Sequence, residues 1–368
     1  MKKNDIFLIY GTDYKKMTRE ILEAADLAGM IGDRDARIGF KPNLVLAKPP
    51  ESGATTHAEL LAGTIEYLHA HGFHNIRIME GSWVGGDTER AFRAAGYDRI
   101  AGQYRIPLIN LQKDSAREYD AAGMKIRLCD AAASVDFMIN MPVLKGHCQT
   151  RITCALKNNK GVIPNSEKRR FHTLGLHKPI AHLNTIARND FILVDNICGD
   201  LDFEEGGSPV PMDRILAFAD PVLCDAFVCD TMGYAVEDVP YISMAEKLGV
   251  GSADLSSASV HMLNHPGEVR TITPSGKVAR LARYVTASDA CSACYGALIH
   301  ALNQLDEEGF LDRSFQKNPV AVGQGFRSAS GPIGVGNCTR RFACSQPGCP
   351  PSTNEILSFL KEHWKGRS

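Results

Sequence analysis

The chain has 368 residues, with 41 Lys and Arg against 42 Asp and Glu, a formal net charge of −1 and 23% charged residues. This length is enough for two domains, or for one large domain with a cap. The balanced charge excludes a strongly basic surface, so we expect no nucleic-acid partner. No apolar stretch reaches the roughly 20 residues of a membrane span, so we expect no membrane association.

The amino-terminal segment does not have the pattern of a secretory signal. Its apolar run, Ile6–Tyr10, is too short for a signal-peptide core. The chain nevertheless contains 11 cysteines. We therefore expect a cytoplasmic protein, because clustered cysteines in a reducing compartment serve metal or redox chemistry more often than disulfides.

Strand and helix patterns alternate along the first half of the chain. Apolar periodicity and turn residues predict strands at 6–10, 37–45, 75–79, 107–111, 137–141 and 191–194, and helices at 14–28, 55–71 and 88–95, the second capped by Thr55 or Thr56. This alternation predicts an α/β fold with an open, mostly parallel sheet and helices on both faces.

Polar residues follow the predicted strands. In open α/β sheets, ligands bind beyond the carboxyl ends of the strands. We therefore expect one rim formed by Lys41, Asn43, Glu80, Ser82, Lys145, His147 and Asp195.

The pattern loosens after residue 197. A strand is expected at 214–218, a helix after Asp220-Pro221, and an extended or hairpin connection at 266–283. Ser288-Asp289 is expected to cap a helix that carries two cysteines in its first turns, and 352–363 reads as a further helix. We predict an α/β domain over 1–285 and a cysteine-rich, metal-binding region over 286–368.

The last quarter of the chain contains the most specific motif. The predicted ligands are Cys291, Cys294, Cys338 and Cys349, set among glycine and proline turns. Four converging thiolates suit a 4Fe-4S cluster, and they also satisfy a structural zinc, which is the alternative. The spacing matches neither ferredoxins nor zinc fingers, and Cys344 is able to replace either of the last two.

The other six cysteines lie among apolar residues, where cysteine usually only packs. They are Cys129, Cys148, Cys154, Cys198, Cys224 and Cys229. Cys148 and Cys154 flank the segment described next, so a role for these two stays open.

Residues 140–172 form a second notable segment, rich in lysine, amide and hydroxyl side chains. Lysines at a strand end suit phosphate or carboxylate binding. The alternative is a solvated basic loop, but the position beside Lys41 and Asn43 favours a site for an anionic small molecule. We expect anion binding by Lys41, Lys145, Lys157 and Lys160, orientation by Asn43 and Asn158, and proton transfer by His147 or His172, with Lys145 also in the catalytic set.

These motifs resemble one known family. The resemblance rests on Lys41-Pro-Asn-Leu-Val, Thr55-Thr56-His57, Glu80-Gly-Ser82, Asn140-x-Pro142-x-x-Lys145-x-His147, Lys157-Asn158-x-Lys160-Gly161, Asp195 and Asp220-Pro-Val-x-x-Asp225. Together they look like the domain of unknown function 362 family over roughly residues 37–250. The resemblance implies an association with iron–sulfur clusters and adds Thr56, His57, Glu80, Ser82 and Asp195 to the ligand-binding set. Ferredoxin-type cysteine repeats accompany many members, but this chain carries the four-cysteine set instead.

A second resemblance is local. Gly336-x-Cys338, followed by Gly348-Cys349-Pro-Pro and a helix, is similar to the cluster-binding end of the small subunits of nickel–iron hydrogenases and respiratory complex I. It covers about 25 residues, and the paired cysteines of those subunits are not matched in position.

Three functions are consistent with these patterns. The first is a redox-linked iron–sulfur enzyme acting on an anionic small molecule, with a redox partner protein. The second is a cluster-bearing electron carrier or assembly protein that docks an acidic partner. The third is an anion-binding transferase or lyase with zinc in the cysteine site. A homodimer is the commonest assembly for such proteins.

Overall fold

The computed structural model describes residues 1–207, 209–265 and 276–364. The chain forms two compact units, the first made of residues 1–170 and 177–274 and the second of residues 171–176 and 275–368. The long segment of the second unit begins at residue 275, eleven residues before the predicted start at residue 286, and the predicted division stays a prediction. In the described residues, no helix is both long enough and apolar enough to span a membrane.

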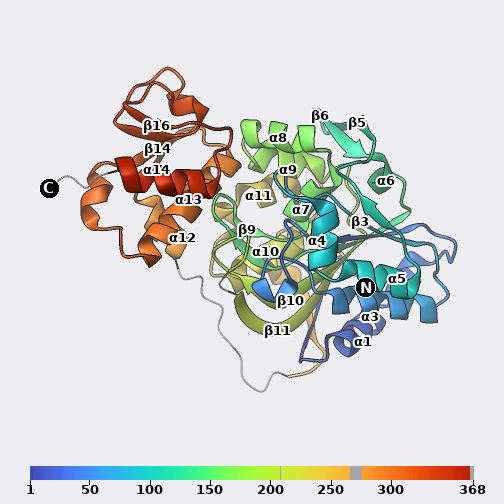
Figure 1. The fold of residues 1–368 in the computed structure, drawn as a ribbon. Helices are drawn as coiled ribbons and strands as arrows, with labels where there is room; N and C mark the ends of the chain where they lie inside the picture. The colour runs from blue at the N-terminus through green and yellow to red at the C-terminus, as the bar shows by residue number, and fades with distance from the viewer. Residues whose placement is uncertain (208, 266–275, 365–368) are drawn as a thin grey trace. The chain divides into compact units, whose positions relative to one another are not determined.

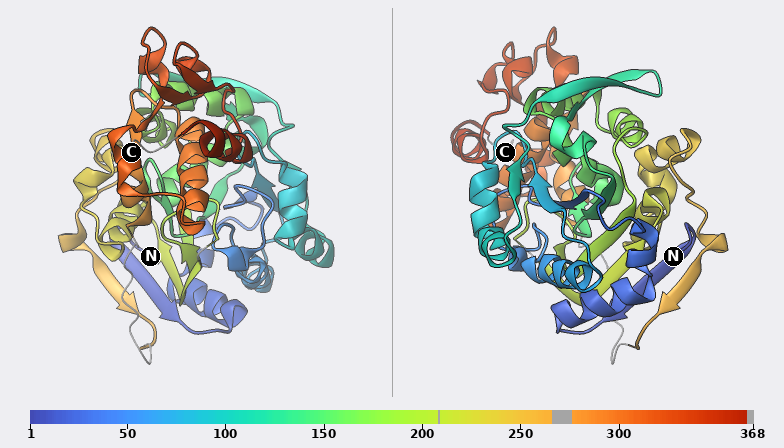
Figure 2. Two further views of the ribbon diagram at one scale, coloured as in Figure 1. Left: turned by 60° about the vertical axis from the view of Figure 1, so that its left-hand side comes forward. Right: turned by 90° about the vertical axis from the view of Figure 1, so that its right-hand side faces the viewer.

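The first unit is built on an eight-stranded sheet with the order β12-β1-β11-β10-β7-β2-β3-β4. Only β11 runs antiparallel to its neighbours within this sheet. The strands are β1 (Asp5–Tyr10), β2 (Ile38–Pro42), β3 (Ile76–Glu80), β4 (Leu108–Asn110), β7 (Phe137–Met141), β10 (Phe191–Asp200), β11 (Pro209–Phe218) and β12 (Ser259–Met262). Figure 2 shows β12 lying along β1 at the edge of the sheet. The predicted mostly parallel α/β sheet is confirmed.

Helices cover both faces of this sheet (Figure 1). On one side lie α1 (Tyr14–Ala24), α2 (Leu27–Ile31), α3 (Ala58–Ala70), α4 (Thr88–Ala94) and α5 (Tyr97–Tyr104). Their buried residues, among them Ile21, Leu61 and Phe92, join strand residues such as Phe40 and Ile139 in one hydrophobic core. On the other side lie α7 (Ala155–Asn158), α9 (His177–Leu183), α10 (Pro221–Thr231) and α11 (Pro240–Lys247).

Shorter elements complete the first unit. A β-hairpin, β5 (Ala116–Ala121) with β6 (Met124–Cys129), leads into α6 (Asp130–Ala133), and β8 (Lys145–His147) pairs with β9 (Arg151–Thr153). The helix α8 (Asn165–Leu174) ends in the segment that packs with the second unit. The hairpin, α8, α9, α11 and β12 were not predicted.

The second unit contains a parallel four-stranded sheet with the order β13-β14-β15-β16. Its strands are β13 (Val285–Ala287), β14 (Val320–Val322), β15 (Ile333–Val335) and β16 (Cys344–Gln346), and its helices are α12 (Lys277–Ala282), α13 (Ser292–Glu307) and α14 (Thr353–His363). The helix expected at 352–363 is α14, and a capping box between Ser352 and Glu355, which was not predicted, begins it. Trp364 follows this helix, is buried, and donates a hydrogen bond to the Asn318 carbonyl.

Four local predictions were wrong, each for an identifiable reason. The helix expected at 14–28 is interrupted at Asp26, whose φ of 53° cannot continue a helix. The helix α3 begins after His57, because Thr55 and Thr56 use their hydroxyls on distant carbonyls. Residues 277–282 are helical rather than extended, while 266–275 lie outside the described residues. The helix with the first two cysteines begins after Cys291 rather than at Ser288.

Candidate functional site

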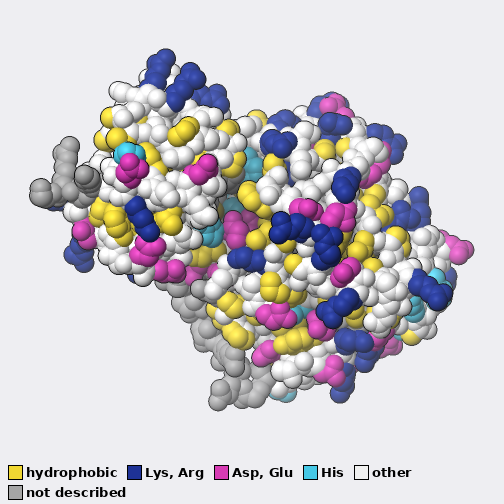
Figure 3. Space-filling model, viewed as in Figure 1, with side chains coloured by type: hydrophobic (Ala, Val, Ile, Leu, Met, Phe, Trp, Pro, Cys, Tyr) yellow, Lys and Arg dark blue, Asp and Glu magenta, His cyan; other side chains and the backbone are white. Residues whose placement is uncertain are grey.

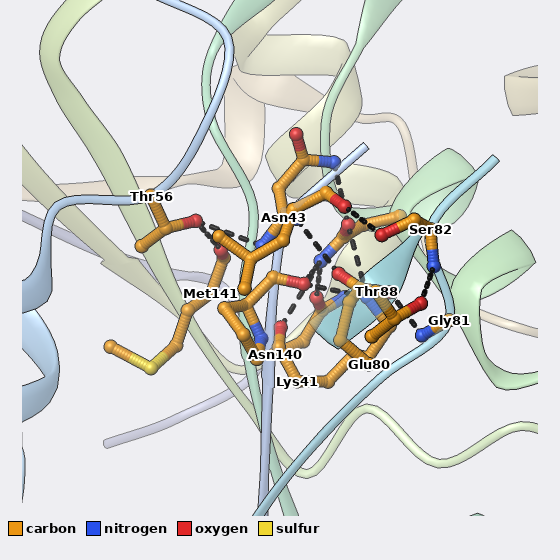
Figure 4. A network of polar contacts seen from close by, with 12 residues as sticks. Lys41, Asn43, Thr56, Glu80, Gly81, Ser82, Thr88, Asn140 and Met141 are labelled. Atoms are coloured by element: carbon orange, nitrogen blue, oxygen red, sulfur yellow. Dashed lines mark hydrogen bonds and ion pairs between the residues drawn. The ribbon is translucent and has the colours of Figure 1, made fainter. Parts of the chain in front are cut away.

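The carboxyl ends of three neighbouring parallel strands bring their polar residues together. Lys41 comes from β2, Glu80 from β3 and Asn140 from β7, and Figure 4 shows the three side chains pointing toward one another. Lys41 and Asn140 have no exposed surface, and Glu80 has 2%. The predicted rim is therefore a buried polar layer, which we call the polar core.

An ion pair lies at the centre of the polar core. The Nζ of Lys41 lies 2.8 Å from Oε2 of Glu80 and also donates to the Pro42 carbonyl. The same carboxylate accepts the backbone N–H groups of Leu44 and Gly81, so both oxygens are engaged. Burial lowers the pKa of Lys41, although the Glu80 charge opposes this change. Since each ion compensates the other, neither is poised to bind an external ion.

Amide side chains extend this network to the next strand. Asn158 accepts a hydrogen bond from Asn43 at 2.8 Å and donates one to Asn140 at 2.7 Å. Lys145, fully buried, donates to the side-chain oxygen of Asn43 at 2.7 Å and to the Ala54 carbonyl. Burial lowers the pKa of Lys145 to about 8. Asn43 and Asn158 thus hold lysines in place through a chain of hydrogen bonds.

Glu204 joins two predicted site residues and was not itself predicted. Its carboxylate pairs with Nζ of Lys157 and lies 3.1 Å from Nε2 of His147. Burial acts against ionisation of Glu204, but the combined effect of Lys157, His147 and Lys145 outweighs it and holds the pKa of this carboxyl well below its usual range. Glu204 lies in a turn after β10, where no periodic pattern marks it, so only its long-range contacts reveal it.

The ring of His147 is engaged at both nitrogens. Its Nδ1 accepts the backbone N–H groups of Gln149 and Thr150 at 3.1 and 3.0 Å, so the ring proton lies on Nε2 and faces Glu204. Burial and the charge of Lys157 lower the pKa of His147 to about 4. The ring is therefore neutral near pH 7. Its predicted role in proton transfer stays a prediction.

Lys160 differs from the other predicted lysines. Among the described residues, no hydrogen-bond acceptor or carboxylate contacts its amine, and its side chain is half-buried. Burial and the charge of Lys157 lower the pKa of Lys160 to about 7. Nearby Lys168 is instead engaged by the carbonyls of Gly81 and Ser82, each at 2.8 Å. Lys160 is thus the predicted lysine best placed to meet an external anion.

The remaining predicted residues of the first unit have local partners. Thr56 donates to the Met141 carbonyl and Ser82 to the Leu44 carbonyl, each at 2.7 Å, which ties loops to the strand ends. His57 contacts Asp195 through both its backbone N–H and Nδ1, at 2.7 and 2.8 Å. Burial opposes a charge on His57, but the attraction of Asp195 outweighs it and raises the pKa of His57 to about 11. His172 belongs to the segment 171–176, which is part of the second unit, and its predicted role in proton transfer stays a prediction.

The four predicted cysteine ligands of the second unit act on one another electrostatically. Burial, followed by the thiols of Cys291, Cys349 and Cys338, raises the pKa of Cys294 to about 12. Cys338 and Cys349 likewise raise the pKa of Cys291, after burial. Cys344 lies in β16, where it pairs with Ile333 of β15. Thiols that hinder one another's ionisation in this way are suited to a positively charged centre.

Turn residues shape the backbone around these thiols. The Sγ of Cys294 lies 3.5 Å from the position a Cβ would take on Gly336, whose φ of 92° also favours glycine. The Asn337 N–H donates to the Gly348 carbonyl, and its side chain accepts the Gly348 N–H, both at 2.9 Å. These bonds join the loops that carry Cys338 and Cys349. Gln324 donates to the Sγ of Cys291 at 3.5 Å.

The spacing of the thiols bears on which metal they fit. Tetrahedral zinc with Zn–S bonds of about 2.3 Å places its sulfurs about 3.8 Å apart. In the described residues, no three of these four sulfurs lie within 4.8 Å of one another. A four-iron cluster carries its cysteines on separate iron atoms and so needs a wider arrangement. The donors present fit such a cluster better than a single zinc ion.

A second group of possible metal ligands lies in the first unit. The ligand atoms of Cys154, Cys224 and Asp225 all lie within 4.8 Å of one another, and all three residues are buried. The two sulfurs are 3.7 Å apart. Burial raises the pKa of Asp225 to about 7, and its carboxylate also accepts the Leu156 N–H at the start of α7. This group has a structural role at the beginning of a helix.

Charged side chains of both signs alternate on the face of the molecule in Figure 3. This agrees with the formal net charge of −1. Lysines of the polar core do not contribute to this surface, since Lys41, Lys145 and Lys157 are buried.

Comparisons with known proteins show similarity to a curated protein and to a solved structure. The chain is 22% identical to a thylakoid-associated protein of Synechocystis sp. over 262 residues, which is 68% of this chain and 79% of that protein. Among solved structures, it is similar to the lactate racemase apoprotein of Thermoanaerobacterium thermosaccharolyticum, with 13% identity and a TM-score of 0.34. That likeness covers 51% of this chain and 50% of the racemase chain.

A family match covers the polar core itself. Residues 38–230 match the family described as "Domain of unknown function (DUF362)", which is more than half of the chain. The matched segment includes strands β2, β3, β7 and β10 and therefore Lys41, Glu80, Lys145 and Asp195. The four-cysteine group lies outside the match. The chain belongs to this family of domains of unknown function, DUF362.

Proposed function

We propose that this chain is an iron–sulfur protein that holds a 4Fe-4S cluster on Cys291, Cys294, Cys338 and Cys349. The observation that carries the proposal is the proximity of these four thiols: after burial, the neighbouring thiols raise the pKa of Cys291 and of Cys294, and among the described residues no three of the sulfurs lie as close together as one zinc ion requires. When bound, such a cluster supplies one-electron transfer.

The residues around the thiols are suited to this role. Cys291 is the N-cap of α13 and Cys294 lies in its first turn, where the helix dipole favours thiolates. Gln324 supplies a hydrogen bond to the Cys291 sulfur, a contact of the kind that tunes the potential of a cluster. Cys349 is exposed, which suits electron exchange with a redox partner protein.

We further propose that the polar core serves an anionic small molecule, which makes the chain a redox-linked enzyme. Lys160 carries this part of the proposal, because its amine has no partner among the described residues. Lys157, Glu204 and His147 lie in the same network and would position that amine and its ligand. A pure electron carrier would have no use for this buried arrangement of lysines and amides.

The proposal is tested by purifying the protein without oxygen and measuring its visible spectrum together with its iron, zinc and acid-labile sulfide. The expected result is a brown protein with about four iron and four sulfide per chain. A colourless protein that contains zinc, or no metal after reconstitution with iron and sulfide, would overturn the cluster. A brown protein without affinity for anions such as sulfate would instead support the electron-carrier function.

A further inference from the structure

A register shift between β10 and β11 lies beside one cysteine. Asn196 pairs with Arg214 and Cys198 with Pro211, so the extra residue of the bulge is in β11, where Asp213 has a φ of 47°. Side chains alternate between faces along a regular strand, which would place Asp195 and Cys198 on opposite faces. Beside the bulge in β11, both residues nevertheless contact the same histidine. Bulges are over-represented beside active sites.

The histidine shared by these residues is His57, at the N-cap of α3. Its Nδ1 lies 2.8 Å from Oδ2 of Asp195, and its Nε2 lies 3.9 Å from the Sγ of Cys198. The Asp195 carboxylate also accepts the backbone N–H groups of His57 and Ile197, at 2.7 and 3.1 Å. The carboxylate is thus fixed, it fixes the imidazole ring, and the ring presents its far nitrogen to the thiol.

This is the order of groups found where a cysteine acts as a nucleophile. Such a site needs a thiol beside an imidazole, and an acceptor that orients the imidazole from its other nitrogen. Asp195 also raises the pKa of His57 against the effect of burial, so the ring carries a positive charge near neutral pH. A positive imidazolium beside a cysteine favours the thiolate.

We propose that Cys198 is a catalytic nucleophile that accepts acyl groups from esters or thioesters, with His57 as proton donor and Asp195 as positioning residue. This activity is independent of the iron–sulfur cluster. It uses residues of the first unit alone, and water is the co-reactant.

The reaction balances in two steps. The Cys198 thiolate attacks the carbonyl carbon, the new C–S bond forms, and the bond to the leaving group breaks as that group takes the Nε2 proton of His57. Neutral His57 then accepts a proton from water, whose oxygen attacks the thioester carbon. The C–S bond breaks, the carboxylic acid leaves, and the thiolate and imidazolium are restored.

Access to the thiol limits the size of the acyl compound. Cys198 has 8% and His57 5% of their surface exposed, and the Pro50 carbonyl lies 3.5 Å from the sulfur. A small probe is therefore the right first substrate. The other buried cysteines of the first unit are the natural comparison, because burial raises the pKa of Cys129, Cys154, Cys224 and Cys229 and none of them has this histidine.

The test treats the whole protein with p-nitrophenyl acetate, follows p-nitrophenol release, and locates the acetyl group by peptide mass mapping. We expect acetylation of Cys198 before the other cysteines of the first unit, and a burst of p-nitrophenol that disappears in Cys198→Ala but not in the control Cys229→Ala. His57→Gln is expected to slow acetylation about 100-fold.

Circular dichroism and thermal melting show whether His57→Gln retains the fold. The order of labelling in the unmodified protein requires no variant, so the proposal stays testable if a variant does not fold. Acetylation of Cys198 no faster than of Cys229, or an unchanged rate in folded His57→Gln, would overturn the proposal.

Discussion

The polar core and the four-cysteine group both bring ionisable side chains together, but they differ in whether the charges have partners within the protein. In the polar core, Lys41 meets Glu80 and Lys157 meets Glu204, so buried charges are compensated within the protein. In the cysteine group, burial and then the neighbouring thiols raise the pKa of Cys291 and of Cys294, and Cys349 is exposed. The first arrangement is compensated within the protein, whereas we propose that the second is compensated by a bound cluster.

This contrast leads to a general expectation. A network that is already compensated stabilises the fold, and its binding function is limited to the groups left without a partner, here Lys160. A group of like, uncompensated ligands contributes little to the fold until its metal arrives. Substitutions in the two regions should therefore differ in kind, affecting stability in one and metal content in the other.

The largest expected effect is on the cysteine group. Cys294→Ser and Cys349→Ser should each remove most of the iron and sulfide of the reconstituted protein, because each takes away one of four ligands. Cys344→Ser is the matched control and should retain full iron content, since Cys344 lies in β16. Iron and sulfide analysis after anaerobic reconstitution checks this. If Cys344→Ser loses its iron while the other two variants keep theirs, Cys344 is a ligand of the cluster and the proposed ligand set is wrong.

The next largest effect is expected at the central ion pair. Glu80→Gln should lower the free energy of unfolding by about 3–5 kcal/mol, because it leaves the buried charge of Lys41 without its partner. Urea denaturation measures the change. Glu20→Gln removes an exposed pair with Lys16 and should produce no measurable change. If Glu80→Gln and Glu20→Gln have equal free energies of unfolding, Glu80 does not compensate the buried charge of Lys41.

A smaller effect is expected from His147 in acid. Because burial lowers the pKa of His147 to about 4, the unfolded chain binds a proton between about pH 6.5 and 4 that the folded chain does not. Stability should fall as the pH falls through this window, by about 2–3 kcal/mol at pH 4.5. His147→Gln should remove this part of the pH dependence. Denaturation curves at pH 6.5 and 4.5 give the free energy of unfolding of the unmodified protein and of His147→Gln. If this free energy falls by the same amount in both, groups other than His147 cause the pH dependence.

The smallest effect concerns anion binding. Since the pKa of Lys160 is lowered to about 7, its amine is mostly protonated at pH 6 and mostly neutral at pH 8. Sulfate keeps its charge over this range, so its affinity should fall about tenfold from pH 6 to pH 8. Isothermal calorimetry is the measurement. Lys160→Met should abolish this change, while Lys178→Met, at an exposed position, should preserve it.

The sequence was most informative where chemistry follows regular structure. Lys41, Glu80 and Asn140 each come at the end of a buried apolar strand, and parallel strands bring such ends to one edge of the sheet. Their convergence could therefore be predicted. The cysteine group was predictable for a different reason, because thiols set in glycine and proline turns have few structural uses.

The remaining features depend on geometry that no local pattern encodes. Glu204 lies in an irregular turn, and its contact with Lys157 spans 47 residues. Cys198 and His57 are 141 residues apart in the sequence, and their contact lies beside a one-residue bulge in β11 that no local sequence pattern predicts. The partners of the buried lysines could not be predicted either, because a sequence shows charged residues but not their contacts. Lys41 pairs with Glu80, and Lys145 donates to Asn43 and to the Ala54 carbonyl.

The position of the first strand has a consequence for how the protein is made. β1 spans Asp5–Tyr10, but its two neighbours in the sheet, β11 and β12, lie at 209–218 and 259–262. A ribosome that adds about 5–20 residues per second needs tens of seconds to make both neighbours after β1 has emerged. Throughout that time the strand has both of its hydrogen-bonding edges open. Nascent chains of this protein should therefore depend on chaperones that shield the first strand until synthesis has passed residue 262.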